Sequence, residues 1–169
     1  IDWPAETQKA FEDVVQNGGG MVSVHAADNS FPTWRAYNLM IGIGGWGNRD
    51  EKSGALWYYK DGKLVSDTTP GRGGSHVNRL PYKVTIRNSD HPITKGLPKE
   101  WMHQGDELYN SLRGPGENMT VLATAHSDPT PGKGTYRDEP DLIVLNYGKG
   151  RIFHTTMGHD VSAMSCVGF

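Results

Sequence analysis

The sequence of 169 residues has little cysteine, no long apolar run and no large excess of charge. Its single cysteine, Cys166, excludes an intramolecular disulfide and any metal site built from several cysteines. Its apolar runs are far too short to cross a bilayer, and no basic segment followed by an apolar one marks the N-terminus. We therefore expect a soluble protein without membrane contact, and both cytoplasm and periplasm stay open as its location.

The charge balance argues against nucleic acid as a partner. The chain carries 17 basic and 19 acidic residues, for a net charge of -2, and no stripe of Lys and Arg that could neutralise a run of phosphates. The hydrophobic share of 36% lies near the globular average, whereas 22 glycines and 10 prolines indicate many turns. We expect a single domain over residues 1–169 with a loop-rich surface.

Helical and extended patterns alternate in the first quarter of the chain. Residues 3–16 place Phe11, Val14 and Val15 on one face of a helix, and residues 21–25 follow as a short strand. A second helix is expected between a cap at Ser30 and a stop at Gly42. This alternation is typical of an α/β fold, in which helices cover a parallel sheet.

The rest of the chain is richer in strands. Residues 56–65 predict a hairpin around Asp61-Gly62, and residues 141–146 and 151–157 predict a second one around a glycine-rich turn. The chain opens on a helix, with no strand before it to begin a parallel sheet, and it closes on an apolar tail. We therefore expect a domain that is truncated at both ends.

Familiar nucleotide and zinc motifs give no support here. The glycines of residues 42–47 match G-x-G-x-x-G, but the pattern follows a helix, whereas dinucleotide binding requires a preceding strand. No H-E-x-x-H occurs and the histidines are scattered, so a metal site would have to be assembled from distant elements. We predict no cofactor and no metal ligands, with a divalent metal left open.

Two histidines stand at the ends of predicted strands. His25 ends the first strand and His159 follows the last one, and in an open α/β sheet ligands bind outside the carboxyl ends of the strands. If these two strands are parallel neighbours, both histidines face one crevice. From spacing alone, a histidine that is packed against a backbone carbonyl explains His25 equally well. His154, within its strand, is expected to be a packed or edge residue.

Carboxylates and aromatic side chains supply further candidates. Asp106 and Glu107 are adjacent, so in an extended chain they point to opposite faces and one of them at most enters a given pocket. Aromatic rings stack on sugars and build ordinary cores equally well. Trp46, in a glycine-rich loop, is the better ligand candidate, and Tyr109 is the second.

Taken together, several short motifs resemble the ThuA-like (trehalose utilisation) family, whose fold is that of the class I glutamine amidotransferases. The resemblance covers nearly the whole chain, and its motifs are residues 18–28, 44–46, 91–96, 106–109, 148–153 and 158–160. It implies a flavodoxin-like, three-layer α/β fold with an open, mostly parallel sheet and an added β-hairpin region. In the amidotransferase relatives a nucleophilic cysteine stands where this chain has His25, and the catalytic histidine corresponds to His159. Because glutamine hydrolysis needs a thiolate, we do not expect a glutamine amidotransferase.

The resemblance implies carbohydrate metabolism, in particular the processing of keto-disaccharides such as 3-keto-trehalose by a lyase, hydrolase or isomerase. A small carbohydrate is then the ligand, while an oxidoreductase that makes the keto sugar stays open as a partner, as does self-association. We assign His25 and His159 as the acid/base pair, with Asp106 or Glu107 as an orienting group or sugar-hydroxyl ligand. The predicted sugar-binding residues are Asp28, Trp46, His103, Tyr109 and Asp160. Two alternatives remain, a sugar-binding or sensing module without turnover and a metal-assisted glycoside hydrolase.

Overall fold

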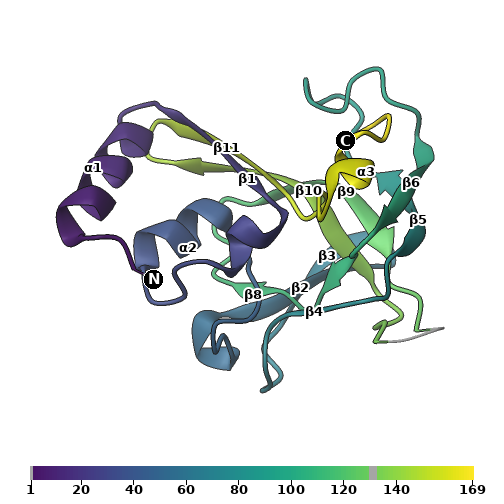
Figure 1. The fold of residues 1–169 in the computed structure, drawn as a ribbon, viewed down its shortest axis with the longest axis horizontal. Helices are drawn as coiled ribbons and strands as arrows, with labels where there is room; N and C mark the ends of the chain where they lie inside the picture. Colours follow the sequence, from purple (N-terminus) through teal and green to yellow (C-terminus); the bar gives the residue numbers. More distant parts are fainter. Residues whose placement is uncertain (1, 130–132) are drawn as a thin grey trace.

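The computed structural model describes residues 2–129 and 133–169 of the chain, which form a curled sheet with a few short helices (Figure 1). Its helices are α1 (Ala5–Gln16), α2 (Arg35–Ile41) and α3 (Val161–Met164), with 3₁₀ turns η1 (His25–Asn29) and η2 (Glu51–Ser53). Its strands are β1 (Gly20–Val24), β2 (Ala55–Lys60), β3 (Lys63–Asp67), β4 (Ser75–His76), β5 (Leu80–Ile86), β6 (Glu100–Asp106), β7 (Tyr109–Asn110), β8 (Arg113–Gly114), β9 (Thr120–His126), β10 (Asp138–Tyr147) and β11 (Gly150–Thr155).

The main sheet is mixed, and the prediction of a mostly parallel sheet was wrong. Its strands follow the order β1-β11-β10-β9-β5-β6, with β2 paired to β10 and with β3 and β8 paired to β2. Strand β1 pairs with β11 in parallel, whereas the other strand pairs described in this sheet are antiparallel. Parallel neighbours need a long crossover between them, but β5 to β11 follow one another through loops without helices, as antiparallel strands do.

Helices cover one face of the sheet at the end that holds β1 and β11 (Figure 1). The apolar sides of α1 and α2, including Val15, Met40 and Ile41, pack on Ile143 and Ile152 of the sheet. On the opposite face of these strands Phe169 of the C-terminal segment lies near Val24 and Phe153, and the expected three-layer arrangement is not confirmed. The reason is again the chain order, because the described residues between β5 and β11 form no crossover helix for a second layer.

The predicted first helix is confirmed, and the start of the second is corrected. Helix α1 begins after Pro4, whose fixed φ suits this position, and it ends before Asn17. Helix α2 starts at Arg35 rather than after Ser30, because Ser30 caps the end of η1 and residues 31–34 form a turn in which Phe31 has a φ of 47°. Gly42 ends this helix as expected, with a φ of 76° that only glycine adopts at little cost.

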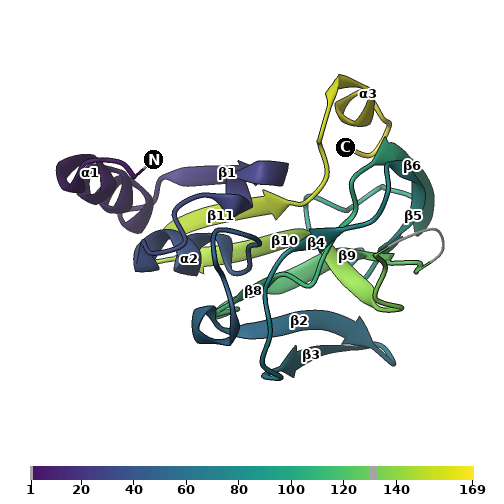
Figure 2. The ribbon, with the colours of Figure 1, turned by 60° about the horizontal axis from the view of Figure 1, so that its bottom comes forward.

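Both predicted hairpins are present. Strands β2 and β3 meet at Asp61 and Gly62, which have φ values of 51° and 75°, as a two-residue turn with two positive φ angles requires. Figure 2 shows this pair along the lower edge of the molecule. Strands β10 and β11 form the second hairpin, and β11 also pairs with β1.

None of the helices in the described part of the chain is long and apolar enough to span a membrane.

Close backbone contact at Gly114 joins the hairpin region to the loop after α2. A Cβ atom added at Gly114 would lie 2.1 Å from the carbonyl oxygen of Gly42, a contact with rigid backbone. We expect Gly114→Ala to lower the free energy of unfolding by about 1–3 kcal/mol through this overpacking. Gly20→Ala is the matched control in a strand, because its nearest neighbour would lie 3.9 Å away. Chemical denaturation of both variants checks this, and equal stability of the two would contradict it.

Candidate functional site

His25 stands at the point where β1 turns into η1. Its backbone has a φ of 46°, an uncommon conformation outside glycine that the surrounding contacts must hold. The ring is 5% exposed, and its Nδ1 lies 2.6 Å from the carbonyl oxygen of Thr156. A carbonyl only accepts, so Nδ1 donates and carries a proton. In the neutral ring the other nitrogen, Nε2, is therefore an acceptor with a free lone pair.

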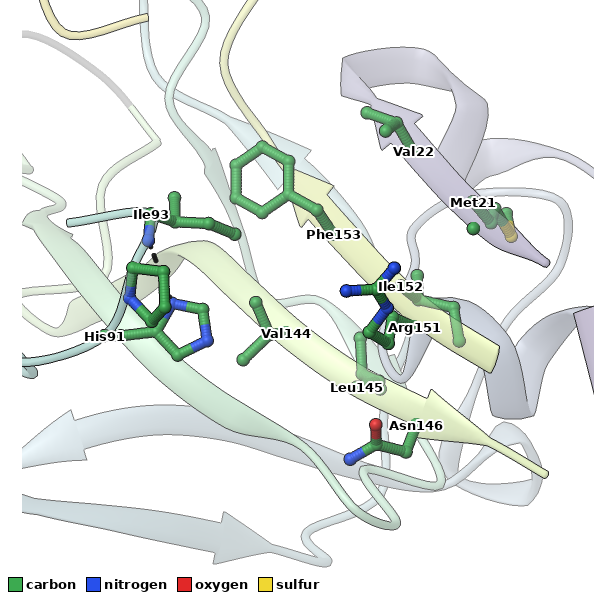
Figure 3. Close-up of a pocket in the computed structure, with 12 residues that line it drawn as sticks. Met21, Val22, His91, Ile93, Val144, Leu145, Asn146, Arg151, Ile152 and Phe153 are labelled. Carbon is green, nitrogen blue, oxygen red and sulfur yellow. Dashed lines mark hydrogen bonds between the residues drawn. The ribbon is translucent and has the colours of Figure 1, made fainter. Parts of the chain in front are cut away.

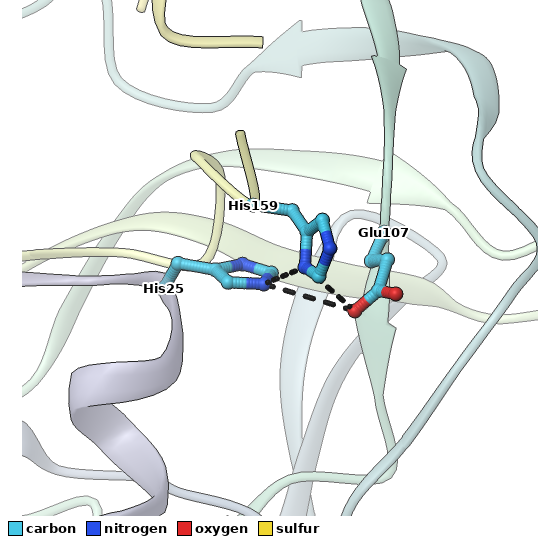
Figure 4. A group of neighbouring side chains, drawn as sticks. All are labelled: His25, Glu107 and His159. Atoms are coloured by element: carbon cyan, nitrogen blue, oxygen red, sulfur yellow. Dashed lines mark hydrogen bonds and ion pairs between the residues drawn. The ribbon is translucent and has the colours of Figure 1, made fainter. Parts of the chain in front are cut away.

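The lone pair of His25 points at two groups from other parts of the chain (Figure 4). Nε2 lies 3.2 Å from Nδ1 of His159 and 3.8 Å from Oε2 of Glu107. The same oxygen of Glu107 lies 3.1 Å from Nδ1 of His159. Since β1 and β11 are parallel neighbours, the chain leaves both strands at the same edge of the sheet, and the expected meeting of the two histidines is confirmed.

His25, Glu107 and His159 form a trio in which the facing acceptor atoms outnumber the protons that could form hydrogen bonds between them. Three potential acceptors, Nε2 of His25, Nδ1 of His159 and Oε2 of Glu107, face one another, and in the neutral state of both rings one proton at most lies among them. The side chains of Glu107 and His159 are 17% and 35% exposed, so solvent or a ligand reaches one side of the trio. Such a centre can accept a further proton or a cation.

Asp106 holds the backbone on which two members of the trio stand. Its fully buried carboxylate accepts hydrogen bonds from the amides of Gly158 at 2.7 Å, His159 at 3.0 Å and Glu107 at 2.8 Å, and from Nε2 of His103 at 3.0 Å. Burial opposes the charge, but the hydrogen bonds from His103 and the amides outweigh it and hold the pKa of Asp106 well below its usual range. Asp106 thus orients the trio, while its neighbour Glu107 enters it.

Aromatic rings cover the trio on one side. Tyr109 lies against the His25 ring at 4.2 Å between centroids, and Trp46 lies 4.7 Å from Tyr109. His76, which sequence reasoning did not select, lies 6.2 Å from Trp46 and 6.5 Å from Tyr109. Burial raises the pKa of Tyr109 to about 12, so its hydroxyl stays protonated and is a hydrogen-bond donor at neutral pH.

Asp28, another predicted sugar ligand, lies behind the trio rather than at its open side. It is fully buried, and its Oδ2 is 3.3 Å from Nε2 of His154, whose Nδ1 donates to the carbonyl of Ile41. Both nitrogens of His154 face oxygens, and its contact with Asp28 joins η1 to β11. His154 is packed, as expected. Asp28 has no exposed surface for a ligand.

Two further predicted sugar ligands have structural partners. His103 is fully buried and donates to Asp106. Asp160 accepts from the amide of Ala163 at 3.0 Å as the N-cap of α3, and it forms an ion pair with Arg79. Of the predicted sugar-binding residues, the structure thus brings Tyr109 and Trp46 to the trio.

Arg49 supports the glycine-rich loop, and sequence reasoning missed it. Its guanidinium is 1% exposed and donates to the carbonyls of Gly45 at 2.8 Å and Ser30 at 2.7 Å, and to the amide oxygen of Asn38. Burial lowers the pKa of Arg49, but the side chain keeps its charge because an arginine starts so high. The only signal in the sequence was a single cation after several glycines, which is too common to predict a buried one.

A large hollow lies elsewhere, on the helix-free face of β1, β11 and β10 (Figure 3). It measures about 670 Å³ and is lined mainly by apolar side chains such as Phe153, Val144 and Ile93. His91 is the one histidine in its lining, and its Nδ1 accepts from the amide of Ile93 at 3.2 Å. The hollow offers apolar surface but no converging reactive groups, so the trio is the better candidate site.

Comparisons with known proteins show which chains this one resembles. A family model described as trehalose utilisation, ThuA, matches residues 2–167. A ThuA-like protein from Parabacteroides merdae is 47% identical with a TM-score of 0.95; the match covers 100% of this chain and 62% of that one, so the chain spans less than two thirds of this relative. A ThuA-like protein from Bacteroides uniformis is 21% identical with a TM-score of 0.60, covering 95% and 57% of the two chains, and shows the fold alone. A comparison with curated proteins found no match.

Removing the charge of Asp106 tests its orienting role. In Asp106→Asn the amides of Gly158, His159 and Glu107 lose their anionic acceptor, and we expect a loss of about 3 kcal/mol in the free energy of unfolding at pH 7. A depressed pKa stabilises the fold above the unfolded value of about 4, and this contribution disappears as the pH falls below it. The variant should therefore also show a shallower loss of stability in acid.

Asp61→Asn is the matched control, because Asp61 lies exposed in the β2–β3 turn and asparagine tolerates its positive φ. Urea unfolding between pH 3 and pH 7 makes the comparison. Equal stability and equal acid slopes in Asp106→Asn and the parent chain would contradict the orienting role.

Proposed function

The chain belongs to the trehalose-utilisation family, which indicates a role in carbohydrate metabolism, and we propose that it processes keto-disaccharides such as 3-keto-trehalose. The supporting observation is the trio, in which two histidines and a glutamate from three distant segments converge at the carboxyl ends of parallel strands. The P. merdae relative extends well beyond the matched part, so the proposal concerns the chemistry of this site.

The proposed reaction is a proton abstraction followed by loss of a glycosidic oxygen. The ketone at C3 of the sugar acidifies the C2–H bond, and a histidine of the trio accepts this proton. The electron pair forms the enolate and then the C1–C2 double bond, while the C1–O bond breaks. The second histidine protonates the departing oxygen. Glu107 stabilises the imidazolium that forms on either ring, because its Oε2 lies 3.8 Å from Nε2 of His25 and 3.1 Å from Nδ1 of His159.

The tautomer of His25 indicates that this ring accepts the proton from C2 of the sugar. Nε2 has a free lone pair, since Nδ1 donates to Thr156, and the His25 ring is therefore prepared to accept a proton. His159 is more exposed, and we assign it the protonation of the leaving group. Its Nε2 gives up a proton to the departing oxygen, while its Nδ1 takes the proton that His25 has accepted on Nε2, 3.2 Å away. Trp46 and Tyr109 offer aromatic surface to an apolar sugar face beside these rings.

Glutamine hydrolysis has no support at this site. The trio holds no thiol, and Cys166 lies elsewhere, with its Sγ 3.4 Å from the amide of Gln104 on β6. The metal-assisted alternative draws on the same three side chains and is argued below.

Exchange of His25 for asparagine tests the reaction most sharply. The side-chain amide nitrogen of the introduced asparagine can replace Nδ1 as donor to Thr156, but nothing replaces Nε2. We expect His25→Asn to lower kcat for 3-keto-trehalose about 100-fold or more, the usual contribution of a general base. His126→Asn is the control, because His126 lies exposed and pairs with Asp138.

Product formation from 3-keto-trehalose and from trehalose is followed by chromatography. Turnover of the keto sugar that survives in His25→Asn would contradict the role of His25. Binding of the sugar without any product would instead support a sensing module.

Loss of the indole ring of Trp46 tests the sugar platform. We expect Trp46→Ala to raise KM for the keto sugar about 3- to 10-fold, as the loss of one stacking contact does, while kcat changes less. Trp57→Ala is the matched control, because Trp57 packs in the β2 hairpin and donates to the carbonyl of Gly114. Steady-state kinetics on both variants separate KM from kcat, and an unchanged KM in Trp46→Ala would argue against stacking there.

A further inference from the structure

We propose that His25, His159 and Glu107 form a binding site for one divalent transition-metal ion of the zinc class. The proposal rests on the proposed function in that it concerns the same site, and it specifies what the site binds before the sugar arrives. Nε2 of His25, Nδ1 of His159 and a carboxylate oxygen of Glu107 all lie within 4.8 Å of one another.

The spacing of the three atoms fits a small metal ion. With metal–ligand bonds of about 2.0–2.1 Å, neighbouring ligands of a tetrahedral ion lie about 3.3 Å apart. The trio shows separations of 3.2 Å, 3.1 Å and 3.8 Å. Two imidazole nitrogens and one carboxylate oxygen are ligands that zinc and its neighbours prefer, whereas calcium and magnesium prefer oxygen alone.

The proton balance favours a cation over a hydrogen-bonded cluster. Because Nδ1 of His25 donates to the carbonyl of Thr156, its Nε2 presents a lone pair in the neutral ring. Nδ1 of His159 and the carboxylate of Glu107 face this lone pair from two sides. A metal ion satisfies all three atoms at once, whereas a single proton bridges two of them at a time.

The groups around the trio match those that support metal ligands. A metal-bound histidine usually donates its other N–H to a carbonyl or carboxylate, as His25 does to Thr156. Asp106 fixes the backbone of both other ligands through the amides of Glu107 and His159. His159 and Glu107 are partly exposed, which leaves a coordination position open on the solvent side, as in catalytic sites with three protein ligands.

A cation bound at this site would change which groups transfer protons in the proposed reaction. With a cation bound, His25 and His159 would be its ligands, and the acid/base steps proposed above would pass to water in the open position, because metal coordination lowers the pKa of water to about 7. A keto sugar with a hydroxyl beside its ketone offers two oxygens for the same cation. The ligand class is thus an α-hydroxyketone that binds next to the aromatic rings of Tyr109 and Trp46.

Metal binding is measured without any sugar, so its result is separate from turnover. The purified chain is treated with chelator, dialysed and titrated with Zn²⁺ by calorimetry and with Co²⁺ by visible absorption. We expect one ion per chain and the intense absorption bands of tetrahedral Co²⁺. His25→Asn and Glu107→Gln should each weaken binding at least 10-fold, while His126→Asn binds as the parent chain does.

A second variant guards against misfolding. His159→Ala alters a partly exposed ring and is expected to fold, as circular dichroism will show, while its affinity falls like that of His25→Asn. Absence of binding, or unchanged binding in folded His25→Asn and His159→Ala, would overturn the metal site. Turnover of 3-keto-trehalose by a chain that binds no metal would overturn the metal site and leave the proposed function intact, whereas metal binding without turnover would do the reverse.

Discussion

The buried carboxylate of Asp106 is the contact on which the candidate site depends. It lies at the end of β6 and accepts hydrogen bonds from two backbone amides in the turn that follows β11, so it links two strands that are distant in the sequence. Its third amide belongs to Glu107, whose side chain then turns toward the histidines. A charge that is buried and fully hydrogen-bonded fixes geometry strongly, because every displaced donor would leave it uncompensated.

The parallel pair of β1 and β11 supplies the other half of the arrangement. The other strand pairs that the structure describes in this sheet are antiparallel, yet the parallel pair of β1 and β11 brings His25 and His159 to one edge. The carbonyl of Thr156, just past β11, then selects the tautomer of His25. A strand pair and one hydrogen bond thus position the candidate site at the carboxyl ends of these strands, where ligands bind in such sheets as a general rule.

Local signals in the sequence predicted much of this structure. The Asp-Gly turn predicted the β2–β3 hairpin, and Gly42 predicted the end of α2, because both need positive φ angles. The meeting of His25 and His159 followed from their places at strand ends. The sheet direction could not be predicted in this way, since it depends on pairing between strands that are far apart in the chain. For the same reason sequence reasoning gave Asp106 and Glu107 interchangeable roles and made His103 and Asp28 sugar ligands, whereas tertiary contacts bury Asp106, His103 and Asp28.

The central claim is that His25 presents the lone pair of Nε2 to the open side of the site. Nitrogen NMR of the chain with ¹⁵N-labelled histidine reads the tautomer of this ring directly, with His25→Asn used to assign the signals. In the metal-free protein at neutral pH we predict that Nδ1 of His25 carries the proton and Nε2 does not. A His25 ring protonated on Nε2 alone would contradict the account, because Nδ1 could then not donate to Thr156 and Nε2 would have no free lone pair.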